Sequence, residues 1–216
     1  MFSKVMKKLI IGACAGFSLS AQAGFIDFTA ADWQGAINSS LTPDMVSYAG
    51  VTIIVDEGEL TFNAGDNAGC LAGQSVTGLA CVGDGLGINN DEITQGGLQK
   101  LILMFSNEID IVDIHLLDLF GGEQTGEVAF IHNAGSQPES FKASANNDGI
   151  VGGYWQTGFT ASGVQSLVIY SAADTFSDFA LARIEYASVP EPSSLAILAV
   201  GLFGLMLVRR KEKVIE

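Results

Sequence analysis

Basic residues are scarce in this chain, and most of them lie at its two ends. Its 216 residues include 10 lysines and arginines against 24 aspartates and glutamates. Residues 1–23 and 189–216 hold seven of the basic residues and three of the acidic ones, which leaves residues 24–188 with three basic and 21 acidic residues. Because this excess of negative charge repels phosphate groups and anionic headgroups, residues 24–188 are not expected to bind nucleic acid or lipid by charge.

Histidine is almost absent, and the motifs of common enzyme classes are missing. The two histidines, His115 and His132, both fall in predicted strands, where an isolated histidine is more often structural than catalytic. The sequence has no G-x-S-x-G nucleophile elbow. The glycine-rich residues 83–87 are followed neither by lysine nor by a predicted helix, as a phosphate-binding loop would be. We therefore predict that the protein is not an enzyme; a secreted hydrolase built around one of the histidines is the least favoured alternative.

Proline is also scarce between residues 24 and 188, whereas glycine is frequent. No segment there keeps a clear helical period over three turns. Short runs rich in β-branched and aromatic residues alternate with clusters of Gly, Asn, Asp and Ser, which is typical of an all-β domain. We predict a jelly-roll-like β-sandwich over residues 24–188. The predicted strands are residues 24–29, 51–56, 59–63, 99–106, 109–119, 127–132, 140–143, 164–171 and 179–187.

Two local features are predicted within this domain. The apolar runs at 51–55 and 60–62 flank a short polar stretch that contains glycine, which favours a β-hairpin. Residues 31–37 are predicted to form a short helix with Thr29 as its N-terminal cap.

The N-terminus has the three parts of a secretory signal peptide, which we assign to residues 1–23. A basic start is followed by an apolar run rich in small residues, and Ala21 and Ala23 then form a small-x-small cleavage site. We expect cleavage after Ala23, so that the mature protein begins at Gly24. Lipidation at Cys14 is the alternative, but the apolar run before that cysteine is too short for a lipoprotein signal.

A short apolar segment lies close to the end of the chain. Residues 194–208 are a predicted transmembrane helix, and a basic cluster of Arg209, Arg210 and Lys211 follows it. A membrane span usually needs about 20 residues, but flanking residues extend a shorter one and basic side chains reach the headgroups. Because cations stay on the cytoplasmic side, residues 212–216 are predicted to be cytoplasmic and the acidic domain to face outward.

The residues just before this helix form the most specific motif in the sequence. Pro190, Glu191 and Pro192 precede the apolar run, and the two prolines keep the chain extended at this point. In order and spacing, residues 189–211 resemble the PEP-CTERM sorting domain of exopolysaccharide-producing Gram-negative bacteria. A proline-rich linker ahead of a plain membrane anchor is the alternative interpretation.

The resemblance implies a route and a partner for the protein. The partner is exosortase, a membrane protease that processes the chain near the Pro-Glu-Pro motif. The route is export across the inner membrane, a membrane-anchored precursor, and then a place at the cell surface or outside the cell. An exported surface or extracellular-matrix protein, associated with exopolysaccharide or biofilm, follows from the same resemblance.

Two of the three cysteines, Cys70 and Cys81, belong to the predicted mature domain. An even pair of cysteines in an exported chain predicts a disulfide. A metal-binding pair is the alternative, but two cysteines without a neighbouring histidine make a poor zinc site.

Side chains with oxygen ligands are concentrated between residues 84 and 92. Asp84, Asn89, Asp91 and Glu92 lie around two glycines, and calcium takes about six to eight oxygen ligands. Their spacing differs from that of an EF-hand loop. The same residues also suit an Asx-rich turn, in which side chains bond the nearby backbone. A weak calcium site and a purely structural turn are therefore both open, and calcium is the one cofactor that the sequence suggests.

Four aromatic residues are candidates for contact with sugar rings. They are Trp33, Tyr154, Trp155 and Phe159, and the adjacent pair Tyr154 and Trp155 lies in a glycine-rich stretch. Together with the candidate calcium residues, they give the alternative hypothesis of a carbohydrate-binding module. In the structural interpretation, one of the paired rings closes the edge of the sheet instead.

Overall fold

The computed structural model describes residues 23–63, 76, 78–89, 92–94, 98–120, 128–142, 153–173, 177–189 and 201. The chain divides into a compact unit, Ala23–Ser188, and a second unit made of Met1–Gln22 and Val189–Glu216. Among the described residues, no helix is long and apolar enough to cross a membrane. The predicted span at residues 194–208 lies outside them, apart from Gly201.

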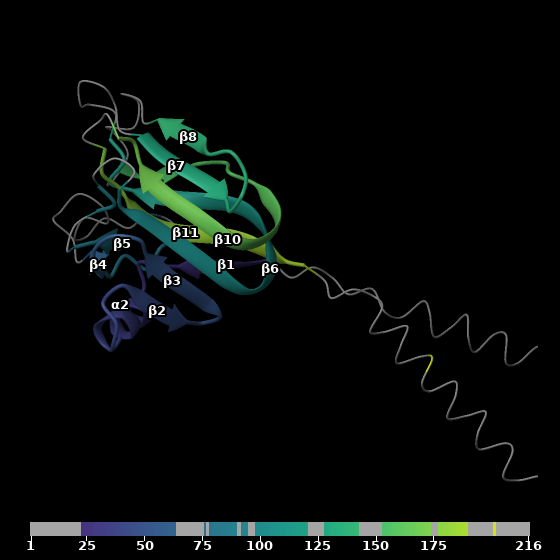
Figure 1. Cartoon of the computed structure of the whole chain (residues 1–216), viewed down its shortest axis with the longest axis horizontal. Coiled ribbons are helices and arrows are strands. Elements are labelled where there is room, and N and C mark those ends of the chain that lie inside the picture. The colour runs from purple at the N-terminus through teal and green to yellow at the C-terminus, as the bar shows by residue number, and fades with distance from the viewer. Residues whose placement is uncertain are drawn as a thin grey trace, which may run out of the picture. The chain divides into compact units, whose positions relative to one another are not determined.

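The described part of the domain consists of β-strands and a short helix, α2 (Ala31–Asn38), which confirms the all-β prediction (Figure 1). The strands are β1 (Ala23–Asp27), β2 (Met45–Tyr48), β3 (Val51–Val55), β4 (Leu60–Asn63), β5 (Gly85–Ile88), β6 (Lys100–Leu117), β7 (Val128–Asn133), β8 (Glu139–Lys142), β9 (Trp155–Gln156), β10 (Ala161–Ser171) and β11 (Ala180–Ser188). Each predicted strand overlaps an observed one, but the predicted strands at 99–106 and 109–119 both fall in β6.

The long strand β6 joins two groups of strands in one antiparallel sheet. Its first part pairs with β3 and β10, and from these the sheet continues to β2 on one side and to β7 and β8 on the other. Its second part pairs with β11 and β9, and β11 continues to β1 and β5, with β4 beyond β5. In Figure 1, β2 and β8 accordingly lie at opposite ends of the first group.

The prediction of two strands at 99–106 and 109–119 is wrong, because β6 is continuous. The three exposed polar residues at 106–108 interrupt the apolar alternation in the sequence. They mark the place where the partner of β6 changes, since β3 pairs as far as Phe105 and β11 from Ile109 onward. The side-chain pattern thus shows the change of partner, not an end of the strand.

A bulge in β6 keeps its apolar side chains directed at one core. Before the bulge, odd-numbered residues such as Leu103 and Ile111 face the core. After Val112, the even-numbered residues Ile114 and Leu116 face it. The pairing with β11 shows the cause. Tyr186 lies opposite Ile111, but its neighbour Glu185 lies opposite Asp113, so Val112 is an extra residue in β6. The extra residue in one strand reverses the faces of all later residues.

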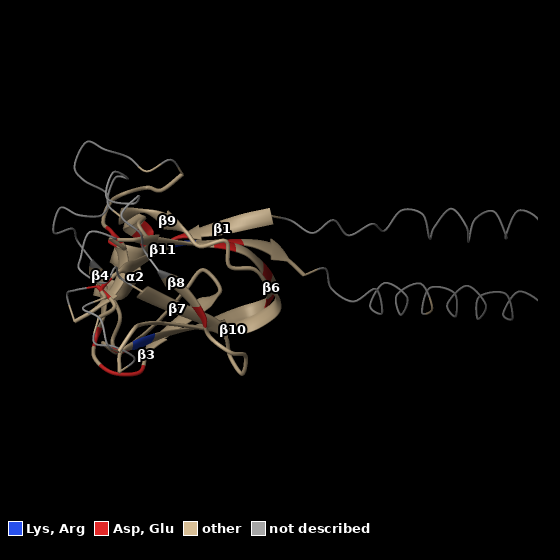
Figure 2. Ribbon diagram, turned by 90° about the horizontal axis from the view of Figure 1, so that it is seen from above, with Lys and Arg blue, Asp and Glu red and all other residues tan. Residues whose placement is uncertain are grey.

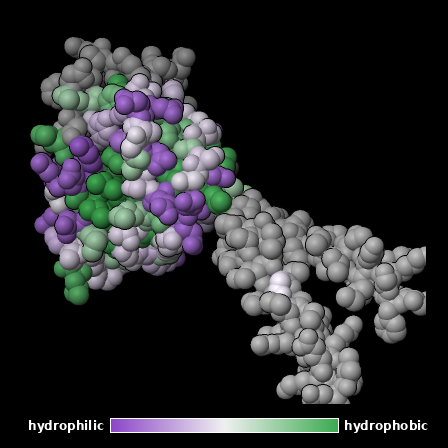
Figure 3. Space-filling model, turned by 45° about the vertical axis from the view of Figure 1, so that its right-hand side comes forward, coloured by the Kyte–Doolittle hydropathy of each residue, from purple (hydrophilic) through white to green (hydrophobic). Residues whose placement is uncertain are grey.

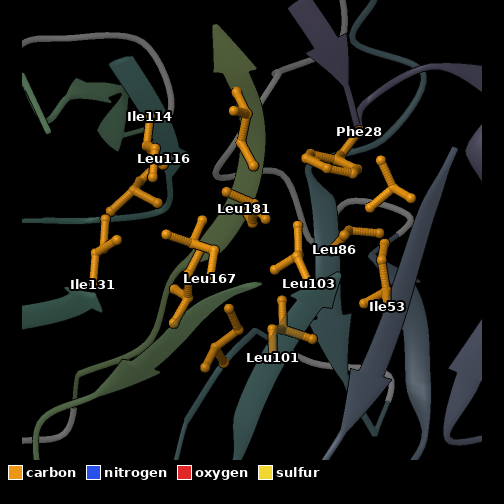
Figure 4. Packing of buried hydrophobic residues seen from close by; sticks show 14 of the residues in the cluster. Phe28, Ile53, Leu86, Leu101, Leu103, Ile114, Leu116, Ile131, Leu167 and Leu181 are labelled. Atoms are coloured by element: carbon orange, nitrogen blue, oxygen red, sulfur yellow. The ribbon is translucent and has the colours of Figure 1, made fainter. Parts of the chain in front are cut away.

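Both groups of strands contribute to one hydrophobic core, and their side chains point toward one another (Figure 4). The first group supplies Ile53 and Leu103, and the second supplies Leu86, Ile114 and Leu181. A smaller cluster, consisting of Val76, Leu79, Leu117, Ala180 and Ala182, is separate from this core.

The predicted hairpin between 51–55 and 60–62 is wrong. Strand β3 pairs with β2 and β6, whereas β4 pairs with β5. Strand β3 alternates buried and half-buried residues and lies between two partners, so the exposed residues 56–59 lead the chain away to another part of the sheet. The glycine-containing stretch between the two runs favoured a hairpin in the sequence. In the structure, both strands pair instead with strands that are distant in the sequence.

The helix forms where it was predicted, but Thr29 does not cap it. The residue at the cap position is Ala30, and it makes no side-chain cap hydrogen bond. The Thr29 hydroxyl instead donates to Asp27 Oδ1 (2.6 Å) and accepts from the Cys81 amide (3.0 Å). Trp33 anchors the helix through ring contacts with Phe28 and Tyr48.

Among the charged residues of the described domain, Asp and Glu are common and Lys and Arg are rare (Figure 2). Hydrophobic side chains such as Leu41, which is 99% exposed, also reach the surface. On the face seen in Figure 3, hydrophobic and hydrophilic residues are intermingled.

Candidate functional site

The chain enters and leaves the domain on neighbouring strands. Ala23 at the start of β1 pairs with Ala187, and Gly24 pairs with Tyr186, near the end of β11 (Figure 1). The predicted signal cleavage bond between Ala23 and Gly24 therefore lies in the sheet, beside the last residues of the domain. Ala21 lies outside the described residues.

Strand β1 is fastened to the domain at its far end by Asp27. Its carboxylate accepts hydrogen bonds from the Thr29 amide (2.9 Å), the Thr29 hydroxyl and the Ala80 amide (2.7 Å). The amide of Phe28 donates to the Ala182 carbonyl oxygen (2.8 Å). Strand β1 is thus tied both to β11 and to the segment around Ala80.

The predicted sorting residues begin just beyond the folded domain. Val189 follows β11 and is the last described residue before the Pro-Glu-Pro motif. Pro190, Glu191 and Pro192 lie outside the described residues, as does the basic cluster of Arg209, Arg210 and Lys211.

Residues 188–211 match the family model of the PEP-CTERM protein-sorting motif. The chain carries a PEP-CTERM motif. The match starts at the last residue of β11, so the sorting motif follows the domain without an intervening linker. A PEP-CTERM motif indicates export, a membrane-anchored precursor and processing by exosortase. No curated protein matches the chain.

A polar cluster surrounds His115 on the face of β6 opposite the main core. His115 is only 2% exposed, and its Nδ1 lies 2.6 Å from the Tyr154 hydroxyl. Its Nε2 lies 3.7 Å from Asp113 Oδ2 and 3.5 Å from Glu185 Oε1. Arg183 in turn donates to Glu185 Oε1 (2.9 Å), which balances part of the negative charge.

Burial determines the charge of His115. It lowers the pKa of the imidazole, although the carboxylates of Asp113 and Glu185 act in the opposite direction, and Arg183 lowers the pKa further. Burial likewise raises the pKa of the Tyr154 hydroxyl, although a hydrogen bond from Gln156 acts to lower it. A neutral, buried imidazole held by a neutral phenol fastens β9 and its surroundings to β6.

Lowering the pH from 7.5 to 5 is expected to destabilise the domain through His115. Its folded-state pKa lies below the ordinary 6.5, so the unfolded chain takes up the proton first as the pH falls. The stabilisation from neutral His115 is therefore complete well above pH 6.5 and decreases below it. The measurement is the free energy of unfolding in urea at both pH values.

The matched variants are His115→Gln and His132→Gln. The first should lose less stability than the wild type between pH 7.5 and 5, because the buried titrating group is gone. The second removes a half-buried histidine of β7, whose Nδ1 lies near the Asn133 carbonyl oxygen, and leaves the His115 cluster intact. Equal pH dependence of wild type and His115→Gln would contradict the assignment.

The aromatic candidates for sugar contact are placed very differently. Trp33 and Phe159 are each 3% exposed, so neither ring is open to contact with a sugar. Tyr154 is half-buried with its hydroxyl on His115. Trp155 pairs with Leu116 through β9 and packs against the main core.

The predicted calcium residues are separated by a strand. Asp84 and Asn89 lie at opposite ends of β5, and an extended chain of that length holds them roughly 16 Å apart, too far to share one ion. Asn89 adopts φ of +61°, and its Oδ1 accepts from the Glu59 amide (2.8 Å). Glu92 is half-buried, and Asp91 lies outside the described residues.

Among the described residues, no group of three or more His, Cys, Asp or Glu could hold a metal ion. Of the predicted disulfide, Cys81 is half-buried beside the small cluster around Leu117, with φ of +53°. Cys70 lies outside the described residues, so the bridge between the two stays a prediction.

Proposed function

We propose that the protein is a non-enzymatic surface or matrix protein that exosortase processes at its C-terminal tail. The observation that carries this proposal is the PEP-CTERM motif at residues 188–211, directly after the last strand. A signal peptide at residues 1–23 exports the chain, and a helix at 194–208 anchors the precursor in the membrane. The processed domain then associates with exopolysaccharide at the cell surface or in the biofilm.

For the exported domain we propose a jelly-roll-like β-sandwich. Support comes from the long strand β6, which belongs to both groups of strands, and from the single core to which both groups contribute. The acidic surface suits a domain that must remain soluble outside the cell.

The histidines support a structural rather than a catalytic role. His115 is buried under Tyr154, and His132 lies on β7, which belongs to the other group of strands. A general base needs access to the proton that it removes, which the burial of His115 prevents.

Replacing Pro190 and Glu191 together with alanine is expected to abolish processing of the tail. The change leaves the apolar segment and the basic cluster intact, so membrane insertion should persist. In a host with an exosortase, the wild type should lose its C-terminus, whereas the variant should accumulate as a full-length membrane species. The measurement is the mass of the C-terminal peptide in the membrane and extracellular fractions.

The matched control is the double variant Glu212→Ala with Lys213→Ala, which changes the tail beyond the basic cluster. It should be processed like the wild type. If the wild type and the Pro190/Glu191 variant yield the same C-terminal peptide in the same fraction, the tail is a plain anchor and the proposal fails. Co-purification of the processed wild type with extracted exopolysaccharide tests the matrix role separately.

A further inference from the structure

The side of the first group of strands that faces away from the core is apolar and partly exposed. We call this side the outer face. Its central row of side chains crosses five strands, from β2 through β3, β6 and β10 to β7 (Figure 1). The row consists of Met45, Ile54, Ile102, Val168 and His132. Met45 is 40% exposed and the other four are half-buried, so the described domain leaves the row open to a partner.

Two further rows flank this one and complete the outer face. The first passes through Met104, which is 48% exposed and belongs to the middle strand, β6. The second passes through Tyr170, which lies between Lys100 of β6 and Phe130 of β7 in the register. The Tyr170 ring stacks on that of Phe130, with 5.2 Å between their centroids, and Lys100 Nζ lies 6.0 Å from the Tyr170 centroid. Large apolar or aromatic side chains therefore occupy all three rows.

Acidic side chains are absent from the described positions of these three rows, although residues 24–188 contain 21 acidic residues and three basic ones. One acid, Asp56, follows β3 at the rim, where its carboxylate lies 3.9 Å from Lys100 Nζ. The second group of strands differs, because Asp113 and Glu185 lie beside His115 on the side away from the core. A water-exposed surface of so acidic a domain would ordinarily carry carboxylates. Their absence favours a surface that another molecule covers.

The outer face is large enough for a specific contact. Neighbouring strands lie ~4.8 Å apart and side chains on one face repeat every ~6.8 Å, so five strands and three rows cover roughly 24 Å by 20 Å. Two such faces packed together would bury about 1,000 Å² in total, which is the size at which specific interfaces begin.

The composition of the outer face distinguishes between the molecules that could cover it. A sugar ring stacks on an open aromatic ring, but Tyr170 has Phe130 on one side and Lys100 on the other. An anionic lipid surface repels a domain with this excess of acidic residues. A second copy of the chain brings the same surface without acids, and two such acidic domains repel each other least when these surfaces meet.

We propose that the outer face packs against the outer face of a second copy of this chain. The same surface is used on both copies, so the contact closes as a dimer. Strand β6 is the middle one of the five strands, which places Met104 well inside the contact. The inference concerns the folded domain and holds whether or not the tail is processed.

The test is sedimentation equilibrium of the full-length chain in mild detergent, over a range of protein concentrations. The wild type should show a monomer–dimer equilibrium. Raising the salt concentration should strengthen it, because salt screens the repulsion between the two acidic domains. Met104→Glu should lower the association constant at least about 100-fold, because the contact then has to bury two unpaired carboxylates. Met104→Gln has a similar size without the charge and should lower it less than about tenfold.

The matched control is Val112→Glu. Val112 is on the same strand and equally exposed, at 49%, but it lies beyond the outer face, so this variant should associate like the wild type. A monomeric wild type, or a Met104→Glu variant that associates as strongly as the wild type, overturns the proposal. Extracted polysaccharide that binds a monomeric wild type but not Met104→Glu would show that a sugar chain covers the outer face instead.

Discussion

Replacing Gly85 with alanine is expected to unfold the exported domain or leave it barely stable. Gly85 begins β5 with φ of +113°, and a Cβ atom there would lie 2.3 Å from the carbonyl oxygen of Leu181 and 2.9 Å from its carbonyl carbon. Both atoms belong to the backbone of β11, which pairs with β5 at this point. The overlap cannot be relieved by a side-chain rotation, so the two strands must separate.

Overpacking and the unfavourable φ together should cost roughly 3–5 kcal/mol. That is a large part of the ~5–15 kcal/mol that stabilises an ordinary domain. The measurement is urea unfolding of the exported protein, followed by tryptophan fluorescence and circular dichroism.

Substitutions at two other glycines distinguish the cost of the steric overlap from the cost of the backbone conformation. Gly135 has φ of +86°, but a Cβ there would meet no described atom within 4 Å, so Gly135→Ala should cost only about 1 kcal/mol. Gly35 lies in α2, also without a described neighbour within 4 Å, and Gly35→Ala should stabilise the domain by about 0.5–1 kcal/mol. A Gly85→Ala variant as stable as Gly135→Ala would show that β5 and β11 are not in this contact.

Reducing the predicted bridge between Cys70 and Cys81 is expected to lower the stability by ~3 kcal/mol. The bridge closes a short loop, and in the chain-entropy account the loss follows from the freedom that the unfolded chain regains. The effect should be visible because the Cys81 end is held in the domain. Its amide donates to the Thr29 hydroxyl oxygen, and its neighbours Val76 and Leu79 pack against Leu117.

The measurement is urea unfolding with and without dithiothreitol, alongside mass analysis of non-reduced peptides. Cys14 belongs to the predicted signal peptide, so the mature chain should hold no third thiol. The double variant Cys70→Ser with Cys81→Ser is the control and should unfold alike in both conditions. Two free thiols in the untreated wild type would rule out the bridge.

The sequence located most of the strands but not their partners. Alternation of apolar residues located β3 and β10, because β3 throughout and β10 from Leu167 onward bury every second side chain. The pairing of β3 with β6 and of β4 with β5 depends on contacts across many residues, which local turn signals do not contain. Strand β5 was missed since two of its four residues are glycine, and β9 since it has only two residues.

The same distinction holds for the functional residues. The sorting motif is contiguous, so Pro190, Glu191 and Pro192 stand out in the sequence. The His115 cluster combines β6 and β11 with residues before and within β9, and no local spacing connects them. Arg183 was the one available signal, because a basic residue in so acidic a domain is rare and tends to have a specific partner, here Glu185.

The pairing of the first strand with the last has a consequence for the time course of secretion. A chain threaded through the membrane from its N-terminus delivers β1 first and β11 last, so β1 has no template until translocation is nearly over. Contacts between such distant residues close late, because the long loop between them must be ordered first. The ladder between β1 and β11 is therefore among the last parts of the sheet that can form during export. Chains that end before β11 would leave β1 and the second part of β6 without this partner, and unpaired strand edges favour aggregation.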